Sequence, residues 1–182
     1  KSEGVITIPV IVHVLYNNSK STNEKISAAA VQSEITVLNQ DYSRTNPDTV
    51  NTPAAFKSVA ANVGVQFCLA TTDPSGATLT NPGIEYVATT STGFTTSDDA
   101  KSTSTGGANQ WDPTKYINIW VCDLADKTSG VLGYGEFPTS PLDNTFGVVC
   151  DYRCFGTIGT YLYSGYTKGR VMSHEFSHCF NL

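Results

Sequence analysis

Charged residues are scarce in this 182-residue sequence, and the few that are present are spread along it. They make up 15% of the chain, and the 11 Lys and Arg residues form no cluster. Binding to a phosphate backbone depends on a concentrated positive surface, whereas this chain has a net charge of −5. The composition therefore argues against nucleic acid as a partner.

Long hydrophobic runs are also missing. The longest apolar stretch, residues 5–16, is interrupted by polar residues and by Pro9, and it is far shorter than the roughly 20 residues that cross a bilayer. The first residues, Lys1-Ser2-Glu3, have none of the apolar character of a signal peptide. We expect no membrane span and, for an exported protein, a mature chain whose leader and pro-segment have been removed.

Two common catalytic patterns are absent from the sequence. It contains no Gly-x-Ser-x-Gly nucleophile elbow and no glycine-rich loop of the kind that holds phosphates. Cys179 directly follows His178, so on a helix the two side chains point about 100° apart and form a poor nucleophile–base pair. A thiol protease is therefore disfavoured, as are the enzymes that use the two missing patterns.

The number of cysteines is odd, at five, although an oxidising compartment favours paired cysteines. Cys150 and Cys154 are close enough in sequence to form a disulfide, but no second closely spaced pair completes a zinc ribbon. We expect a disulfide or buried thiols at these two positions rather than a metal site. One of the five cysteines could have its partner outside this sequence.

The residues that are abundant predict a folded, secreted protein with much β-structure. Apolar residues make up 40% of the chain, and Ser, Thr, Asn and Gly are plentiful. Runs of β-branched and aromatic residues predict strands at residues 5–16, 65–70, 84–90, 116–122, 132–138 and 146–152. Pro9 is compatible with the first strand only at an edge or a bulge.

Helices are predicted at three places by capping residues and apolar periodicity. The first begins after Ser27 and presents apolar side chains on one stripe, at positions 31, 35, 38 and 42. The second is short, with Thr52 as its cap, Pro53 at its first position and Gly64 to end it. The third carries the last two histidines and is capped by Thr167. The order β-α-α-β-β-β-β-β-α contains no repeat or linker, so we expect one α+β domain over residues 1–182.

The third helix carries the motif His174-Glu175-Phe176-Ser177-His178. Residues four apart on a helix lie about 40° apart around its axis, so the two imidazoles can reach a single zinc ion. Glu175 lies about 100° around from His174, beside the metal, where its carboxylate can accept a proton from a bound water. The alternative is a helix with one buried and one surface histidine, but two of only three histidines fall in this motif. His13, alone in an apolar strand, is expected to be a packing residue.

Asn181 stands where the third helix is expected to end. Asparagine tolerates the left-handed conformation that stops many helices and reverses the chain. Such a reversal can bring a later residue back to the metal as a third ligand.

The motif and its surroundings resemble a known enzyme family. "HEFSHCFNL" resembles the start of the long metzincin zinc motif, His-Glu-x-x-His-x-x-Gly/Asn-x-x-His. The segments "IPVIVHVLY", "NTPAAF", "VGVQFCLA", "YINIWVC" and "LGYGEFP" are similar, in the same order, to the pappalysin metallopeptidases, particularly the bacterial ulilysin-like branch. The resemblance covers most of the chain. It implies an α/β/α-like metzincin upper subdomain, with a twisted five-stranded mixed sheet, a backing helix and an active-site helix, in a secreted zinc endopeptidase made as a zymogen.

By this resemblance, His174 and His178 are the first two zinc ligands and Glu175 is the general base and acid. The third histidine of the family falls two positions beyond Leu182, and a methionine turn follows later. Because a catalytic zinc has three protein ligands and an open position, we expect the sequence to be the N-terminal subdomain of a larger catalytic domain. The missing C-terminal part would complete the site, and the piece by itself is expected to be inactive. Calcium is left open as a second metal, with no residues assigned to it.

A substrate peptide is expected along residues 133–137, that is Gly133, Tyr134, Gly135, Glu136 and Phe137. If they form a sheet edge above the histidine helix, their free backbone groups can pair with an extended chain. An ordinary edge strand is the structural alternative. Two other functions stay open: a non-catalytic secreted binding or adhesion module, and a zinc hydrolase that takes a downstream Glu as third ligand.

Overall fold

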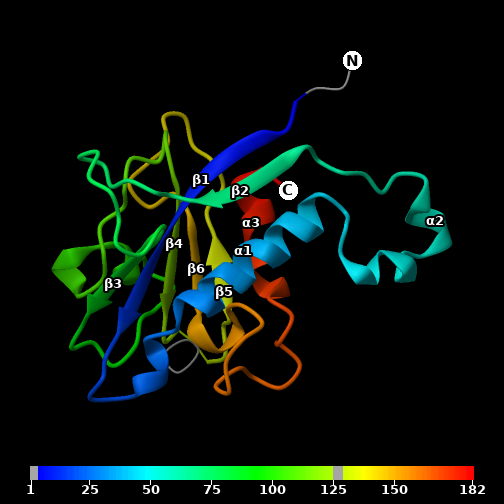
Figure 1. Cartoon of the computed structure of the whole chain (residues 1–182). Helices are drawn as coiled ribbons and strands as arrows, with labels where there is room; N and C mark the ends of the chain where they lie inside the picture. The colour runs from blue at the N-terminus through cyan, green and yellow to red at the C-terminus, as the bar shows by residue number, and fades with distance from the viewer. Residues whose placement is uncertain (1–3, 125–128) are drawn as a thin grey trace.

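The computed structural model describes residues 4–124 and 129–182, which form one sheet with helices packed against it (Figure 1). The strands are β1 (Ile6–Tyr16), β2 (Val65–Leu69), β3 (Ile84–Ala88), β4 (Ile117–Cys122), β5 (Gly133–Gly135) and β6 (Val148–Asp151). The α-helices are α1 (Ala28–Tyr42), α2 (Ala54–Lys57) and α3 (Arg170–Cys179). Short 3₁₀ helices are η1 (Thr22–Glu24), η2 (Pro47–Asn51), η3 (Asp99–Lys101), η4 (Thr103–Thr105) and η5 (Tyr152–Cys154). The order of strands and α-helices agrees with the predicted one.

The sheet has five strand positions, in the order β2-β1-β4-β6-β5, and β3 pairs with the same edge of β1 as β2. The long strand β1 makes this possible, because residues 6–10 pair with β2 and residues 12–16 pair with β3. All these pairs are parallel except that of β5 with β6, which is antiparallel. The structure is therefore the predicted five-stranded mixed sheet, with two short strands that share one position.

Pro9 lies within β1, and its place explains how a proline is accommodated there. Ile6 and Val10 hydrogen-bond towards the β2 side of β1, so the nitrogen of Pro9 faces the other side. Pairing of β1 with β4 begins only at Val10. The missing N–H of Pro9 thus falls where β1 is still an edge, as predicted.

Both faces of the sheet are covered. Val10, Val12 and Val14 of β1 pack with α1 and α3 in the larger apolar core. On the opposite face, Leu15 and Trp120 pack under the connections that contain η3, in a smaller core. The central strand β4 is buried along its whole length, as its apolar content predicted. None of the helices among the described residues is long and apolar enough to cross a bilayer.

Helix α1 begins as predicted, because the Ser27 hydroxyl accepts a hydrogen bond from the Ala30 N–H (3.1 Å). The expected stripe includes the buried Val31 and Leu38, but the same face also buries Glu34 completely. One Glu34 oxygen accepts from the Gly156 N–H (2.6 Å), while the other has no hydrogen-bond partner among the described residues. Burial raises the pKa of Glu34 to about 8.

The caps of the other two helices were predicted wrongly. Thr52 ends η2 and bonds back to the Thr49 carbonyl (2.8 Å), and Pro53 precedes α2 rather than forming its first residue. Helix α2 is a single turn that ends before Gly64, so Gly64 does not stop it. Helix α3 starts after Gly169, which has a left-handed backbone (φ 69°), and not after Thr167.

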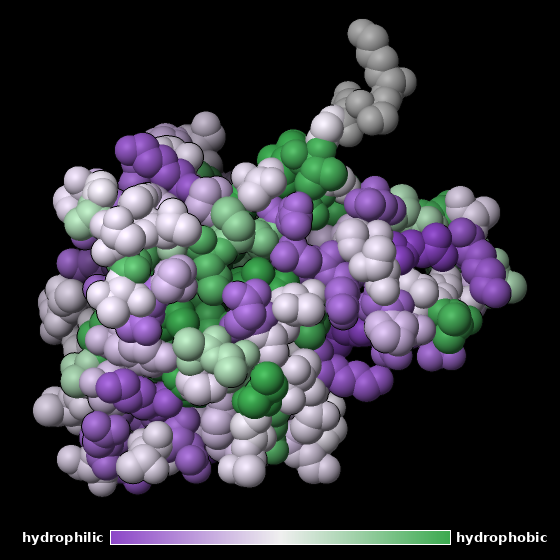
Figure 2. Space-filling model, in the orientation of Figure 1, coloured by the Kyte–Doolittle hydropathy of each residue, from purple (hydrophilic) through white to green (hydrophobic). Residues whose placement is uncertain are grey.

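The segment around α2 extends away from the sheet (Figure 1), and its surface in Figure 2 is mostly hydrophilic with a few hydrophobic residues. Val50, Phe56 and Val59 are among the exposed hydrophobic side chains there. Residues Lys1, Ser2 and Glu3, on which the expectation of a processed start depends, lie outside the described residues.

The buried carboxyl of Glu34 should make stability depend on pH. Its pKa is raised from 4.5 to about 8, so the folded state keeps a proton that the unfolded state loses between these values. Glu34 therefore costs stability increasingly as pH rises from about 4.5 to about 8, and Glu34→Gln, which stays neutral, should avoid this cost. Urea unfolding at pH 5 and pH 9 should show a larger gain for the variant at pH 9, and equal differences at the two pH values would contradict this assignment.

Candidate metal and catalytic site

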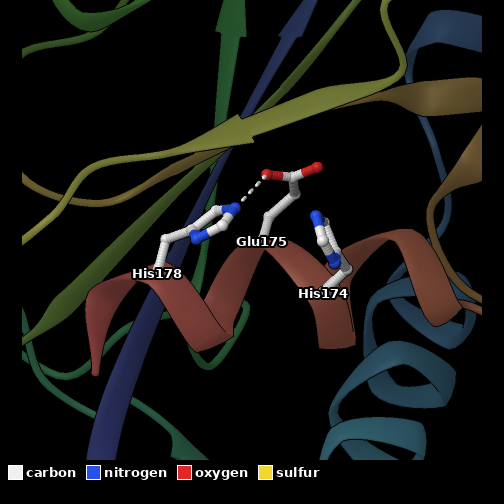
Figure 3. A group of neighbouring side chains, drawn as sticks. All are labelled: His174, Glu175 and His178. Atoms are coloured by element: carbon white, nitrogen blue, oxygen red, sulfur yellow. Dashed lines mark ion pairs between the residues drawn. The ribbon is translucent and has the colours of Figure 1, made fainter. Parts of the chain in front are cut away.

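Helix α3 brings His174, Glu175 and His178 together, as its sequence predicted. Their potential ligand atoms all lie within 4.8 Å of one another, and within residues 4–124 and 129–182 no other such group of His, Cys, Asp or Glu occurs. Figure 3 shows both imidazoles and the carboxylate on the same side of α3, beneath a crossing strand. The centroids of the two rings are 5.0 Å apart, and the ring planes make an angle of 81°. This geometry is compatible with one metal ion held by two histidines.

The end of α3 directs His178 towards this site. Asn181 has a left-handed backbone (φ 63°), as predicted. The Asn181 N–H donates to the His178 carbonyl (2.9 Å) and the Leu182 N–H to the Ser177 carbonyl (3.1 Å), which is the bonding pattern of a Schellman motif. The reversed chain brings the Leu182 carbonyl to 2.9 Å from Nδ1 of His178. Since a carbonyl only accepts, this contact favours the tautomer with the proton on Nδ1, and in the neutral ring that tautomer leaves the lone pair of Nε2 free for a metal.

Glu175 lies between the two histidines and is largely shielded from solvent. Its side chain is 12% exposed, and one carboxylate oxygen is 3.9 Å from Nε2 of His178. Burial raises the pKa of Glu175, while both histidines and the Gly135 N–H act in the opposite direction. A carboxyl whose pKa is moved towards neutrality is suited to accept and return a proton.

Helix α3 is fixed to the rest of the fold by its other side. Ser173 and Arg170 both contact Asp41 of α1, at 2.6 Å and 2.7 Å. Phe176 is fully buried, and its ring lies 5.1 Å from that of Phe67 on β2. These contacts bind the side of α3 that is opposite the histidine group to α1 and β2.

Strand β5 crosses directly over the histidine face, and its glycines allow the close approach. A Cβ atom at Gly135 would lie 2.3 Å from the Glu175 carbonyl oxygen, and one at Gly133 would lie 3.1 Å from Cγ of Glu175. A side chain at Gly135 would push β5 away from α3, so the distance between strand and helix requires glycine at this position. At Gly133 a Cβ would make a tight contact with the Glu175 side chain.

The predicted substrate segment is a sheet edge beside the candidate metal site. Among the described residues β5 pairs only with β6, so its second edge carries no strand. Phe137 follows β5, is exposed, and its ring lies 5.0 Å from that of His178. Tyr134 and Glu136 point away from α3 and contact Asp98 and Lys101 instead. Only part of the segment can therefore reach a ligand through its side chains.

An open hollow of about 520 Å³ adjoins His174 and Glu175. The other residues that line it are Leu132, Gly133, Gly165, Tyr166, Arg170 and Val171. Sequence reasoning assigned no role to Tyr166 or Val171, because no local pattern indicates that the connection before α3 folds back beside the helix. The hollow gives a ligand access to the imidazole and carboxylate groups.

His13 is a packing residue, as predicted. It is fully buried, its ring stacks on Trp120 at 5.4 Å, and its two nitrogens lie 2.6 Å from Glu85 and 3.0 Å from Asn118. His13 therefore connects β1 to β3 and β4, and it is not a member of the histidine group on α3.

All five cysteines lie in the described part of the chain, and none forms a disulfide. Cys150 and Cys154 are buried thiols, which was one of the two predicted alternatives, and burial raises the pKa of Cys154 to about 12. The second possible metal, calcium, receives no support, because within the described residues the histidine group is the one cluster of His, Cys, Asp or Glu side chains that could hold a metal ion.

Three solved structures share this architecture. The chain is 42% identical to mirolysin in complex with compound 9, with a TM-score of 0.86 over 97% of this chain and 63% of that one. It is 41% identical to mature mirolysin of Tannerella forsythia in complex with a cleaved peptide, with a TM-score of 0.87 over 97% and 63%. A promirolysin variant from Tannerella forsythia is 40% identical, with a TM-score of 0.85 over 97% and 55%.

A curated protein also matches, the extracellular metalloprotease of Pyricularia oryzae, which is 23% identical over 180 residues. No protein-family model matches the chain. The chain spans 51% of the curated relative and 63% of the first two solved chains. The similarity therefore concerns part of these longer proteins.

The close contact of β5 with α3 should make Gly135 intolerant of any side chain. Gly135→Ala places a methyl group against the Glu175 carbonyl, so we expect a loss of about 1–3 kcal/mol in the free energy of unfolding. Gly4→Ala is a matched control, because a Cβ there meets nothing within 4 Å. Chemical denaturation measures both variants, and similar stabilities for the two would contradict the explanation that steric exclusion requires glycine at this position.

Proposed function

Since the chain belongs, with mirolysin, to the ulilysin-like branch of the pappalysin-family metzincins, we propose that it is the N-terminal subdomain of a secreted zinc endopeptidase. The observation that carries this proposal is the convergence of His174, Glu175 and His178 beside an open hollow and a free strand edge. Secretion is supported by the curated relative, which is named an extracellular metalloprotease. Synthesis as a zymogen is part of the same proposal.

The donor set fits zinc. Imidazole nitrogen is a preferred ligand of zinc, and the contact of Nδ1 of His178 with the Leu182 carbonyl favours the tautomer of the neutral ring in which Nε2 has its lone pair free. Two histidines leave a tetrahedral ion with room for a third protein ligand and for water. We assign the third ligand to the part of the protein beyond this sequence, so residues 1–182 hold an incomplete site.

Bound zinc would supply a water of lowered pKa and polarise the carbonyl of the scissile peptide bond. Glu175 takes the proton from the attacking water and delivers it to the leaving amine. Its burial favours the uptake of this proton, because shielding from solvent makes the charged carboxylate less favourable. His174 and His178 would hold the ion through their imidazole nitrogens, because both side chains lie on one face of α3.

Strand β5 is the proposed binding edge for the substrate. Its unpaired edge offers backbone N–H and C=O groups to an extended peptide, next to both histidines. Phe137 can contact a substrate side chain, because it is exposed and adjoins His178. A solved structure of mature mirolysin is a complex with a cleaved peptide, which supports a peptide as the ligand.

Removal of the Glu175 carboxylate tests the general-base role. In the full-length protein, Glu175→Gln should lower kcat for peptide hydrolysis by about 10²- to 10⁴-fold while the zinc content stays at that of the wild type. Asp112→Asn is a matched control, because it makes the same chemical change at an exposed carboxylate away from α3. A Glu175→Gln protein with near wild-type turnover would refute the role.

Zinc titration tests the assignment of the third ligand. Residues 1–182 alone should bind zinc much more weakly than the full-length protein, since two imidazoles provide fewer ligands than a catalytic zinc site needs. Isothermal titration calorimetry measures both proteins under one set of conditions. Tight one-to-one binding by residues 1–182 would show that the ligand set is already complete and would overturn the assignment.

A further inference from the structure

The face of β5 that points away from α3 is held by one short segment of the chain. Tyr134 and Glu136 alternate with the two glycines and therefore lie on this face. The Tyr134 hydroxyl donates to Oδ1 of Asp98 (3.2 Å), and Oε1 of Glu136 accepts from Nζ of Lys101 (3.0 Å). Asp98 directly precedes η3 and Lys101 is its last residue. Both side chains thus end on the same turn.

Lys101 is the centre of these contacts. Its side chain is 1% exposed, and its ammonium lies 2.7 Å from Oδ1 of Asp98, 3.0 Å from Oε1 of Glu136 and 2.8 Å from the Thr145 carbonyl. An ammonium has three N–H donors, so each donor has one acceptor. The charge also lies 4.8 Å from the centre of the Tyr134 ring. A buried charge with all its partners in place strongly restricts their positions.

Strand β5 depends on such an anchor because it offers few side chains for packing. It is three residues long, and two of these residues are glycines that contribute no side-chain packing. Glu136 stands between Gly135, where an added Cβ would meet the Glu175 carbonyl oxygen, and Phe137, whose ring lies 5.0 Å from that of His178. Any displacement of Glu136 therefore moves both residues that adjoin the metal site.

We propose that Lys101 is a positioning residue for the substrate: it fixes the height of β5 above α3, and hence the distance between a peptide paired with β5 and the metal site. This inference rests on the proposed peptidase function. Lys101 touches neither the substrate nor the histidines, and it acts through Glu136. Its loss should weaken the binding of peptides that pair along β5 and leave shorter peptides, which do not use this edge, largely unaffected.

Kinetics of the full-length protein test this role. Lys101→Met keeps the apolar stem and removes the charge, and the double variant Lys101→Met/Glu136→Gln also removes the carboxylate that would be left unpaired. Lys115→Met is the matched control, because Lys115 is an exposed lysine paired with Asp112 at 3.4 Å. Each protein is assayed with an extended peptide that spans β5 and with a short peptide that does not.

For the extended peptide, we expect KM to rise about tenfold in both Lys101 variants, with kcat changed by less than about threefold. The short peptide should be cleaved as by the wild type, metal content should not change, and Lys115→Met should match the wild type throughout. An unchanged KM in both Lys101 variants overturns the proposal. So does an equal loss for short and extended peptides, because that result indicates general damage to the site.

Amide hydrogen exchange separates this inference from the proposed function. The Glu136 N–H donates to the Gly147 carbonyl (3.0 Å), and its exchange in Lys101→Met should be about tenfold faster than in the wild type if Lys101 anchors β5. Unchanged exchange overturns the anchor whether or not the protein cleaves peptides. If exchange is faster in Lys101→Met but the zinc-loaded wild-type protein cleaves no peptide, the proposed function is overturned. The role of Lys101 towards a substrate is then overturned as well.

Discussion

The contact between β5 and α3 is the constraint on which the rest of the site depends. The strand can lie this close to the helix because Gly135 has no side chain, and a Cβ at Gly133 would also be in tight contact with Glu175. The crossing shields Glu175 from water while both imidazoles stay accessible from one side. The crossing also leaves the outer edge of β5 open. The helix contacts a face of the strand, whereas the backbone N–H and C=O groups of a strand lie in the plane of the sheet and point towards its edges. Shielded carboxylate and open edge are thus two results of the same packing.

Those features that depend on near neighbours in the sequence could be predicted. The spacing of His174 and His178 places them on one helix face whatever the rest of the fold does, and the structure has them there. The left-handed conformation of Asn181 follows from its residue type at a helix end. The first strand and the Ser27 cap of α1 were predicted for the same reason, since periodicity and capping are local signals. The roles of His174, Glu175 and His178 in catalysis stay predictions.

Features that depend on distant parts of the chain were missed. Glu34 and Gly156 are 122 positions apart in the sequence, and Lys101 and Glu136 are 35 apart. No periodicity indicates that these residues meet. The start of α3 shows the same limit: Thr167 has the chemistry of a cap, but the helix begins after Gly169, where a Cβ would lie 2.7 Å from Oε2 of Glu34. A tertiary contact thus decides where α3 begins, two residues after the start that the local capping signal predicted.

The unequal burial of the cysteines has a practical consequence. Cys122, Cys150, Cys154 and Cys179 are buried, whereas Cys68 is exposed on β2, at the opposite end of the strand order from β5. A maleimide dye or spin label would therefore attach at Cys68 without any engineered mutation. A reporter at that edge observes the sheet from its far side and leaves the groups on α3 untouched.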